Sequence, residues 1–180
     1  MDRGSRAQVL VAIARAAIAN GAAPSSPLEW SDEWLRAPGA SFVTLRLDGA
    51  LRGCIGSIEA RRPLGDDVTH NAYAAAHRDP RFPPLAQGEM PRLGVEVSVL
   101  SPREPLPAAS ETEALARMRP GVDGVYLEYH GLSATFLPQV WEGLPDPRDF
   151  LGELRRKAGL PVSFWDPELR LSRYTVEKYA

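Results

Sequence analysis

The sequence predicts an α+β fold in which mainly antiparallel strands are flanked by helices. Strand patterns occur as hairpins, one over residues 41–56 and another over residues 125–137. Helical patterns lie between these hairpins, without the regular alternation of strand and helix that indicates a parallel sheet. The chain has 180 residues, a length that buries roughly 70% of the unfolded surface. We therefore expect one domain over residues 1–180, with room for two lobes.

Four segments have the pattern of a helix. The first combines abundant alanine with aliphatic residues at helical spacing and ends at Asn20-Gly21, a frequent helix stop. The others begin with acidic or capping residues, which favour the positive end of a helix. The helices are predicted over residues 5–20, 64–78, 110–119 and 147–158. Residues 22–27, with two prolines and two serines, are expected to form a loop.

The first hairpin turns at Asp48-Gly49 and has two alternative registers. A two-residue turn would pair Leu47 with Ala50, Leu45 with Arg52 and Val43 with Cys54. A three-residue turn would pair Leu47 with Leu51, Leu45 with Gly53 and Val43 with Ile55. We prefer the three-residue turn because it keeps aliphatic side chains together, and a shift of one residue moves every side chain to the other face. Further strands are predicted over residues 93–100 and 169–179.

The string LRGCIG, residues 51–56, is the most unusual stretch of the chain. It holds the only cysteine, Cys54, with Arg52 before it and Gly53 and Gly56 around it. Glycine inside a strand often marks close approach of another backbone or a ligand. Because side chains alternate along a strand, Arg52 and Cys54 should share a face, and a nearby guanidinium favours the thiolate. A lone cysteine is also a common small core residue, so both roles stay open.

Composition excludes several functions. The 21 basic and 23 acidic residues leave a net charge of −2, without the basic excess of a nucleic-acid-binding protein. A single cysteine forms no internal disulfide, which fits a reducing cytoplasm. The apolar run over residues 9–19 contains Arg15 and is rich in alanine, so we expect no signal peptide, and it is too short to cross a bilayer. The three histidines lack a familiar metal-ligand spacing, so we expect neither a metal nor an organic cofactor.

Several motifs follow LRGCIG along the chain, and together with it they indicate a protein family. The chain continues with Asp79-Pro80-Arg81-Phe82, then Leu137-Pro138-Gln139-Val140, then Lys157-Ala158-Gly159-Leu160. In this order they resemble the AMMECR-domain family, whose prokaryotic members are called AmmeMemoRadiSam system protein A. The resemblance covers nearly the whole chain. It implies two unequal lobes built on mainly antiparallel sheets, with LRGCIG near the cleft between them.

The resemblance also implies site residues and partners. The positions that match the family motifs are Arg52, Gly53, Cys54, Gly56, Asp79 and Arg81. Ser57 and Ile58 depart from the pattern of many relatives. Relatives are associated with a Memo-like protein and a radical SAM protein, which implies a shared pathway but assigns no reaction to this component.

Two functions are compatible with these residues. In the first, an enzyme uses Cys54 as a nucleophile or acid/base on a small substrate, whose anionic group pairs with Arg52 or Arg81. In the second, a non-catalytic adaptor recognises a ligand or a partner peptide, with Cys54 serving only in packing. Pro80 stiffens the loop that carries Arg81, and this arginine either binds a ligand or ties down loop carbonyls. The contacts of the Cys54 sulfur distinguish the two functions.

Overall fold

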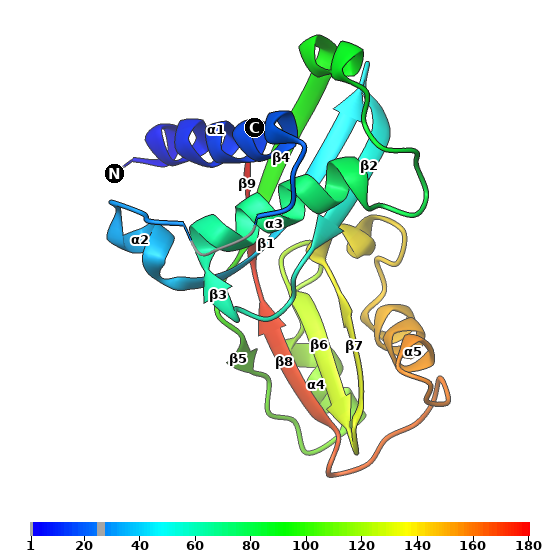
Figure 1. The fold of residues 1–180 in the computed structure, drawn as a ribbon. Helices are drawn as coiled ribbons and strands as arrows, with labels where there is room; N and C mark the ends of the chain where they lie inside the picture. Colours follow the sequence, from blue (N-terminus) through cyan, green and yellow to red (C-terminus); the bar gives the residue numbers. More distant parts are fainter. Residues whose placement is uncertain (1, 25–27) are drawn as a thin grey trace. The chain divides into compact units, whose positions relative to one another are not determined.

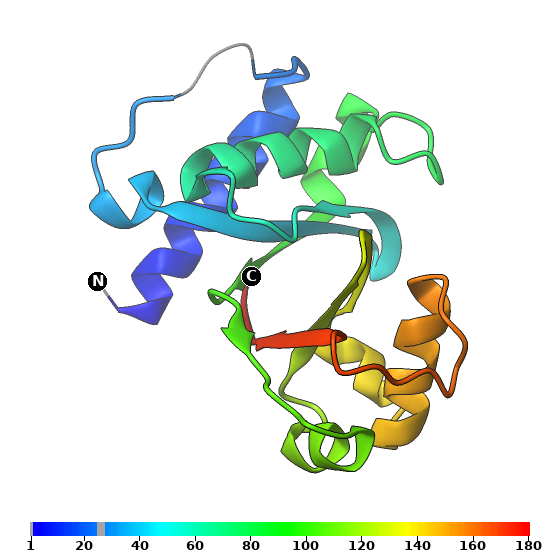
Figure 2. The same cartoon turned by 90° about the horizontal axis from the view of Figure 1, so that it is seen from below.

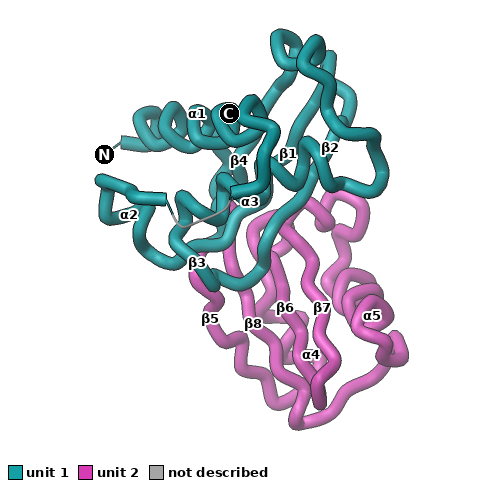
Figure 3. The backbone as a smooth tube through the Cα atoms, viewed as in Figure 1, with its two compact units in different colours: residues 1–100, 177–180 teal, residues 101–176 magenta. Residues whose placement is uncertain are grey.

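A computed structural model of the chain describes residues 2–24 and 28–180, which form two compact units of unequal size (Figure 3). The first unit comprises the residues up to Leu100 together with Glu177–Ala180, and the second comprises Ser101–Val176. The predicted loop over residues 22–27 is described only up to Pro24, and its last three positions lie outside the described residues.

The first unit packs two helices on a sheet (Figures 1 and 2). Its elements are α1 (Arg3–Asn20), α2 (Glu33–Arg36), β1 (Pro38–Leu47), β2 (Ala50–Gly56), β3 (Arg62–Pro63), α3 (Leu64–His77), the 3-10 helix η1 (Gln87–Arg92), β4 (Leu93–Leu100) and β9 (Val176–Tyr179). Within the described residues the sheet has the order β2-β1-β4-β9, and β3 pairs with the start of β1. Alternate residues of the central strands, such as Val43, Leu45 and Val97, are fully buried in one core with Val68 and Ala72 of α3.

The second unit has a separate core. Its elements are β5 (Glu104–Pro105), α4 (Glu111–Arg117), β6 (Gly124–Tyr129), β7 (Leu132–Phe136), the 3-10 helix η2 (Pro138–Glu142), α5 (Pro147–Lys157) and β8 (Arg170–Tyr174). In the described chain its sheet runs β5-β8-β6-β7, with antiparallel pairing throughout. Val125 and Leu127 of β6 are fully buried against Phe150 and Leu154 of α5, and the Trp141 ring stacks on Phe150 at 3.8 Å.

The α+β fold with mainly antiparallel sheets is confirmed, and the helices start and end close to the predicted residues. The caps explain this agreement. Gly21 adopts a left-handed conformation at the end of α1, and the Ser110 side chain accepts the backbone N–H of Glu113 at the start of α4. Both signals lie within a few residues of the helix end, where sequence patterns are most informative.

The single last strand predicted over residues 169–179 is wrong. The chain forms two strands, β8 and β9, which belong to the sheets of different units. The break between the two strands falls at Thr175, because the backbone groups of Thr175 bond to Ser101. Its carbonyl accepts the Ser101 N–H at 2.9 Å, and its own N–H donates to Ser101 Oγ at 2.9 Å.

The hairpin between β1 and β2 combines both predicted registers. The turn is a two-residue turn, with positive φ at Asp48 and Gly49 and with Leu47 opposite Ala50. A bulge then shifts the pairing, so that Leu45 lies opposite Gly53 and Val43 opposite Ile55, as in the three-residue register. Arg52 is the extra residue of this bulge. The preferred register is therefore correct beyond the bulge and wrong at the turn.

Candidate functional site

Arg52 is held by an acidic partner and by loop carbonyls. Its Nε and Nη2 donate to the two carboxylate oxygens of Glu89 at 2.8 and 3.0 Å, and its Nη1 donates to the Pro83 carbonyl at 3.0 Å. The side chain is only 11% exposed. The hydrogen bonds to Arg52 are the main cause that lowers the pKa of Glu89 to about 2, and the same pairing raises the pKa of Arg52. The bulge turns Arg52 toward the loop after α3, so its guanidinium is fully engaged there.

Gly53 and Gly56 are required by packing within the first unit. A Cβ atom on Gly53 would clash with the carbonyl oxygen of Ala75 in α3. A Cβ atom on Gly56 would clash with the ring of Phe42, which covers it from the neighbouring strand. The predicted close approach therefore exists, and what approaches is the protein itself.

Asp79 and Arg81 bind the backbone of Cys54. The Asp79 carboxylate, on a residue only 4% exposed, accepts the Cys54 N–H at 2.9 Å. Arg81 pairs with both oxygens of Asp79 at 2.9 and 2.7 Å, and its Nη2 also donates to the Cys54 carbonyl at 3.2 Å. The hydrogen bonds from Arg81 are the main cause that holds the pKa of Asp79 well below its usual range. Arg81 is thus the arginine beside Cys54.

This arrangement caps a sheet edge. Among the described strands β2 lies at one end of its sheet, so its outer backbone groups have no neighbouring strand. The Asp79–Arg81 pair supplies one acceptor and one donor to the peptide groups of Cys54, as a paired strand would. Covering an exposed edge in this way prevents pairing with other chains.

The Cys54 thiol lies half-buried beside a hydroxyl group. Its Sγ is 3.4 Å from Thr44 Oγ1, across the β1–β2 pair. In the described residues no histidine is a hydrogen-bond partner of this sulfur. His77 Nε2 lies 3.3 Å from the Ile18 carbonyl oxygen, and His130 in the second unit pairs with Glu168. His70 is exposed on α3. In the described ranges, the side-chain partner of the sulfur is therefore a hydroxyl group rather than an imidazole.

A buried polar cluster adjoins the motif at Ser57, the residue that follows LRGCIG. Asp67, 1% exposed, accepts hydrogen bonds from the side chains of Ser41, Ser57 and Asn71 at 2.8 to 2.9 Å. It also accepts the Ser41 backbone N–H at 2.8 Å. Such a buried carboxylate is tolerated only when fully hydrogen-bonded. The cluster ties β1 and the end of LRGCIG to α3.

The structure thus brings Cys54, Asp79 and Arg81 together and directs Arg52 to a different partner. A catalytic or substrate-binding role for these residues stays a prediction. Sequence reasoning missed Glu89 and Thr44. Glu89 lies 37 positions after Arg52, and no local pattern signals such a pairing. The preferred register already places Thr44 opposite Cys54, but strand pairing alone does not show that its hydroxyl contacts the sulfur.

No metal centre or membrane span is formed by the described residues. Residues 2–24 and 28–180 hold no group of three or more histidine, cysteine, aspartate or glutamate side chains arranged to bind a metal ion. No helix in the same ranges has the length and apolar character needed to cross a bilayer.

The α+β fold with two mainly antiparallel sheets belongs to a known class of protein. The model of the AMMECR1 family matches residues 11–179, and the chain belongs to this family. An uncharacterised protein of Pyrococcus horikoshii, PH0010, has a similar structure, with a TM-score of 0.81 and 34% identity over 98% of this chain and 91% of that one.

Curated relatives are similar over comparable lengths. A protein of Methanothermobacter thermautotrophicus is 41% identical over 94% of this chain and 91% of its own length. A protein of Thermotoga maritima is 37% identical over 82% of this chain and 81% of its own. Neither relative carries a functional name, so the chain is an AMMECR1-family protein of uncharacterised function.

Proposed function

We propose that this protein is a non-catalytic recognition module, and that it binds a polypeptide partner through the proline loop, residues 79–86. The observation that carries the proposal is the pairing of both motif arginines. Arg52 and Arg81 each hold a carboxylate through two hydrogen bonds. An anionic substrate would have to displace a charge-assisted bidentate pair, which weighs against the predicted enzyme that uses these arginines.

The proline loop has the properties of a preformed contact surface. The Leu85 N–H donates to the Ala76 carbonyl at 2.8 Å, and the Ala86 N–H donates to Glu89 at 2.8 Å. With the Arg52 bond to Pro83, these contacts fix the loop at several points along its length. A segment already held in one conformation loses little entropy on binding. The loop therefore presents a fixed backbone to a partner.

Three successive side chains of this loop, Phe82, Pro83 and Pro84, are apolar and at least partly exposed. Pro83 and Pro84 are exposed, and the half-buried Phe82 ring lies near two guanidinium groups, with the Arg81 carbon at 5.5 Å and the Arg52 carbon at 6.0 Å from its centre. Aromatic residues, phenylalanine among them, are enriched in protein interfaces relative to the rest of the surface. Phe82 is the expected anchor.

We propose that the partner is the Memo-like or the radical SAM protein of the same organism, and that the protein acts in the cytoplasm. The partners rest on the family motifs, and the location rests on the single cysteine. The experiment is calorimetric titration of each purified partner into the protein. Phe82→Ala should weaken binding by about tenfold or more, because it removes the aromatic anchor.

Two further variants test the rest of the proposal. Cys54→Ala should bind as the wild type does, because the thiol is only a packing group. Val162→Ala, which alters an exposed aliphatic residue of the second unit, should also bind normally. Absence of binding by both partners would refute the choice of partners. A chemical activity of the mixture that Cys54→Ala abolishes would refute the non-catalytic role.

A further inference from the structure

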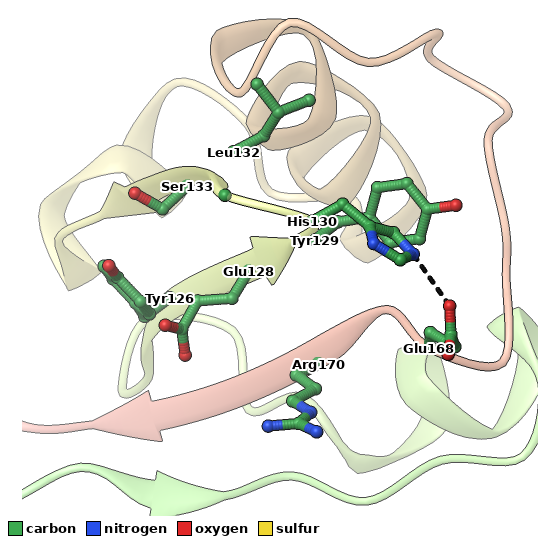
Figure 4. Close-up of a pocket in the computed structure, with 9 residues that line it drawn as sticks. Tyr126, Glu128, Tyr129, His130, Leu132, Ser133, Glu168 and Arg170 are labelled. Carbon is green, nitrogen blue, oxygen red and sulfur yellow. Dashed lines mark hydrogen bonds and ion pairs between the residues drawn. The ribbon is translucent and has the colours of Figure 1, made fainter.

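A pocket on the second unit lies outside LRGCIG and the proline loop. It has a volume of about 350 Å³ and opens on the face of the sheet formed by β6, β7 and β8 (Figure 4). Side chains alternate along β6, so Val125 and Leu127 point into the core and Tyr126 and Glu128 point to the other face. The helices of this unit pack against the core face of the sheet, and the pocket lies on the opposite face.

Opposite charges meet in this pocket without pairing. Glu128 lies opposite Arg170 on β8 and opposite Ser133 on β7, and all three line the pocket. Opposite charges at directly paired positions ordinarily attract each other across a sheet. Within residues 2–24 and 28–180, however, neither the Glu128 carboxylate nor the Arg170 guanidinium makes an ion pair or a hydrogen bond. The pocket therefore offers both an anion and a cation to a ligand.

The two ends of the pocket are fixed by other contacts. At one end His130 Nε2 and Glu168 Oε2 lie 2.7 Å apart, and the Tyr129 ring meets the imidazole edge to face at 4.4 Å (Figure 4). At the other end the Tyr126 ring is covered by the Arg103 guanidinium at 4.1 Å. The unpaired and exposed charges of Glu128 and Arg170 thus lie between these two side-chain contacts.

We infer that this pocket binds a small zwitterion of the α-amino acid class, with its carboxylate on Arg170 and its ammonium group on Glu128. A ligand that carries both charged groups on one carbon atom satisfies two groups that lie opposite each other on adjacent strands. The volume lies at the lower end of the range for small-molecule pockets and accommodates a molecule of this size. A purely anionic ligand would be repelled by Glu128 and Glu168, and a purely cationic one by Arg170. The inference is independent of the proposed function of the proline loop.

The test is NMR titration of the isotope-labelled full chain with each of the common amino acids in turn. A ligand that makes a few hydrogen bonds to an open site should bind at up to about 10 mM. Binding should shift the backbone amide signals of β6, the His130 turn and the start of β8. Shifts confined to those segments support the inference, and absence of shifts with every amino acid overturns it.

Ligand derivatives test the two charges without altering the protein. The N-acetyl derivative and the carboxamide of the tightest-binding amino acid should each bind at least about tenfold more weakly, since each loses one charged hydrogen-bond partner. Equal binding of either derivative overturns the assignment of that charge. Glucose serves as a neutral polyol, and equal shifts with glucose would show a carbohydrate site instead.

Matched variants locate the site. Glu128→Gln and Arg170→Gln should each weaken binding about tenfold, which corresponds to loss of one hydrogen bond to a charged group. Glu142→Gln and Arg148→Gln change exposed residues of the second unit outside the pocket, and they should leave affinity unchanged. An equal loss in the control variants, or no loss in the pocket variants, would overturn the inference. The amide spectrum of each variant reports directly whether it folds.

Discussion

At the scale of single residues, the LRGCIG motif is explained by contacts within the protein. Each glycine lies where a side chain would clash, one with the backbone of α3 and one with the Phe42 ring. The arginine secures the proline loop, and the cysteine is bound through its backbone. The most distinctive string of the sequence is therefore also the place where a strand, a helix and a loop meet.

Replacement of Gly53 by alanine should destabilise the protein by about 2 kcal/mol or more, because the new methyl group would force α3 away from β2. Gly88→Ala is the matched control, since the space around Gly88 is open, and its effect should stay within about 0.5 kcal/mol. Denaturant unfolding measures both free energies. Equal stabilities of the two variants would contradict the close approach of α3.

The Cys54 thiol should react with iodoacetamide more slowly than N-acetylcysteine near neutral pH. It is half-buried beside Thr44, and the arginine nearest to it is committed to Asp79. A reactive thiolate needs both access and an uncompensated positive charge. Mass spectrometry of the labelled protein over time gives the rate. A rate above that of N-acetylcysteine would favour the enzyme that the sequence also allows.

At the scale of elements, β2 and the proline loop stabilise each other through two ion pairs. The Arg52–Glu89 pair holds the far end of the loop, and the Asp79–Arg81 pair holds its beginning against the Cys54 backbone. Both carboxylates have lowered pKa values, chiefly because of their arginine partners. The stability of this segment must therefore depend on pH.

The loop should loosen in acid as Glu89 becomes protonated. The pKa of Glu89 is lowered from 4.5 to about 2, so its contribution is fully present above pH 4.5 and is lost as the pH falls through about 2. Asp79 acts in the same direction. Carboxyl carbon NMR should give a midpoint for Glu89 near 2. A midpoint near 4.5 would show that the pair with Arg52 is absent in solution.

The Glu89→Gln variant provides the matched control for this titration. It keeps the shape of the side chain but removes its charge, so the Ala86 amide should exchange with solvent faster than in the wild type at neutral pH. The remaining acid dependence of the loop should then come from Asp79 alone. A wild-type exchange rate in Glu89→Gln would mean that the loop is held without this carboxylate.

At the scale of the whole molecule, the chain forms two cores, and its last residues belong to the first core. The first unit includes residues up to Leu100 and is completed by Glu177–Ala180, after the second unit has formed from the intervening residues. Tyr179 in β9 is only 4% exposed and belongs to the core of the first unit. The last strand is therefore part of the first fold unit, despite its distance in sequence.

Replacement of Tyr179 by alanine should destabilise the first unit by about 3 kcal/mol, the typical cost of removing a buried aromatic side chain. Hydrogen exchange should become faster in β4, which pairs with β9. Lys178→Ala, at the neighbouring exposed position, should have little effect. If exchange in β4 is the same in both variants, β9 does not contribute to the sheet of the first unit in solution.

The sequence by itself determined the local structure of this protein. It predicted the fold class, the caps of α1 and α4, and both hairpins, because these features depend on residues within a few positions of each other. It also predicted that Gly53 marks a close approach of another backbone. The motifs led to the correct family.

Only the tertiary structure decided how distant groups pair. The partner of Arg52 is Glu89, 37 positions away, and Cys54 receives its cap from Asp79, 25 positions away. The bulge at Arg52 and the break at Thr175 likewise depend on contacts with other segments. Charged and backbone groups pair with whichever partner the fold brings within about 3 Å. Composition and periodicity describe only neighbouring positions of the chain, so they do not predict these distant partners.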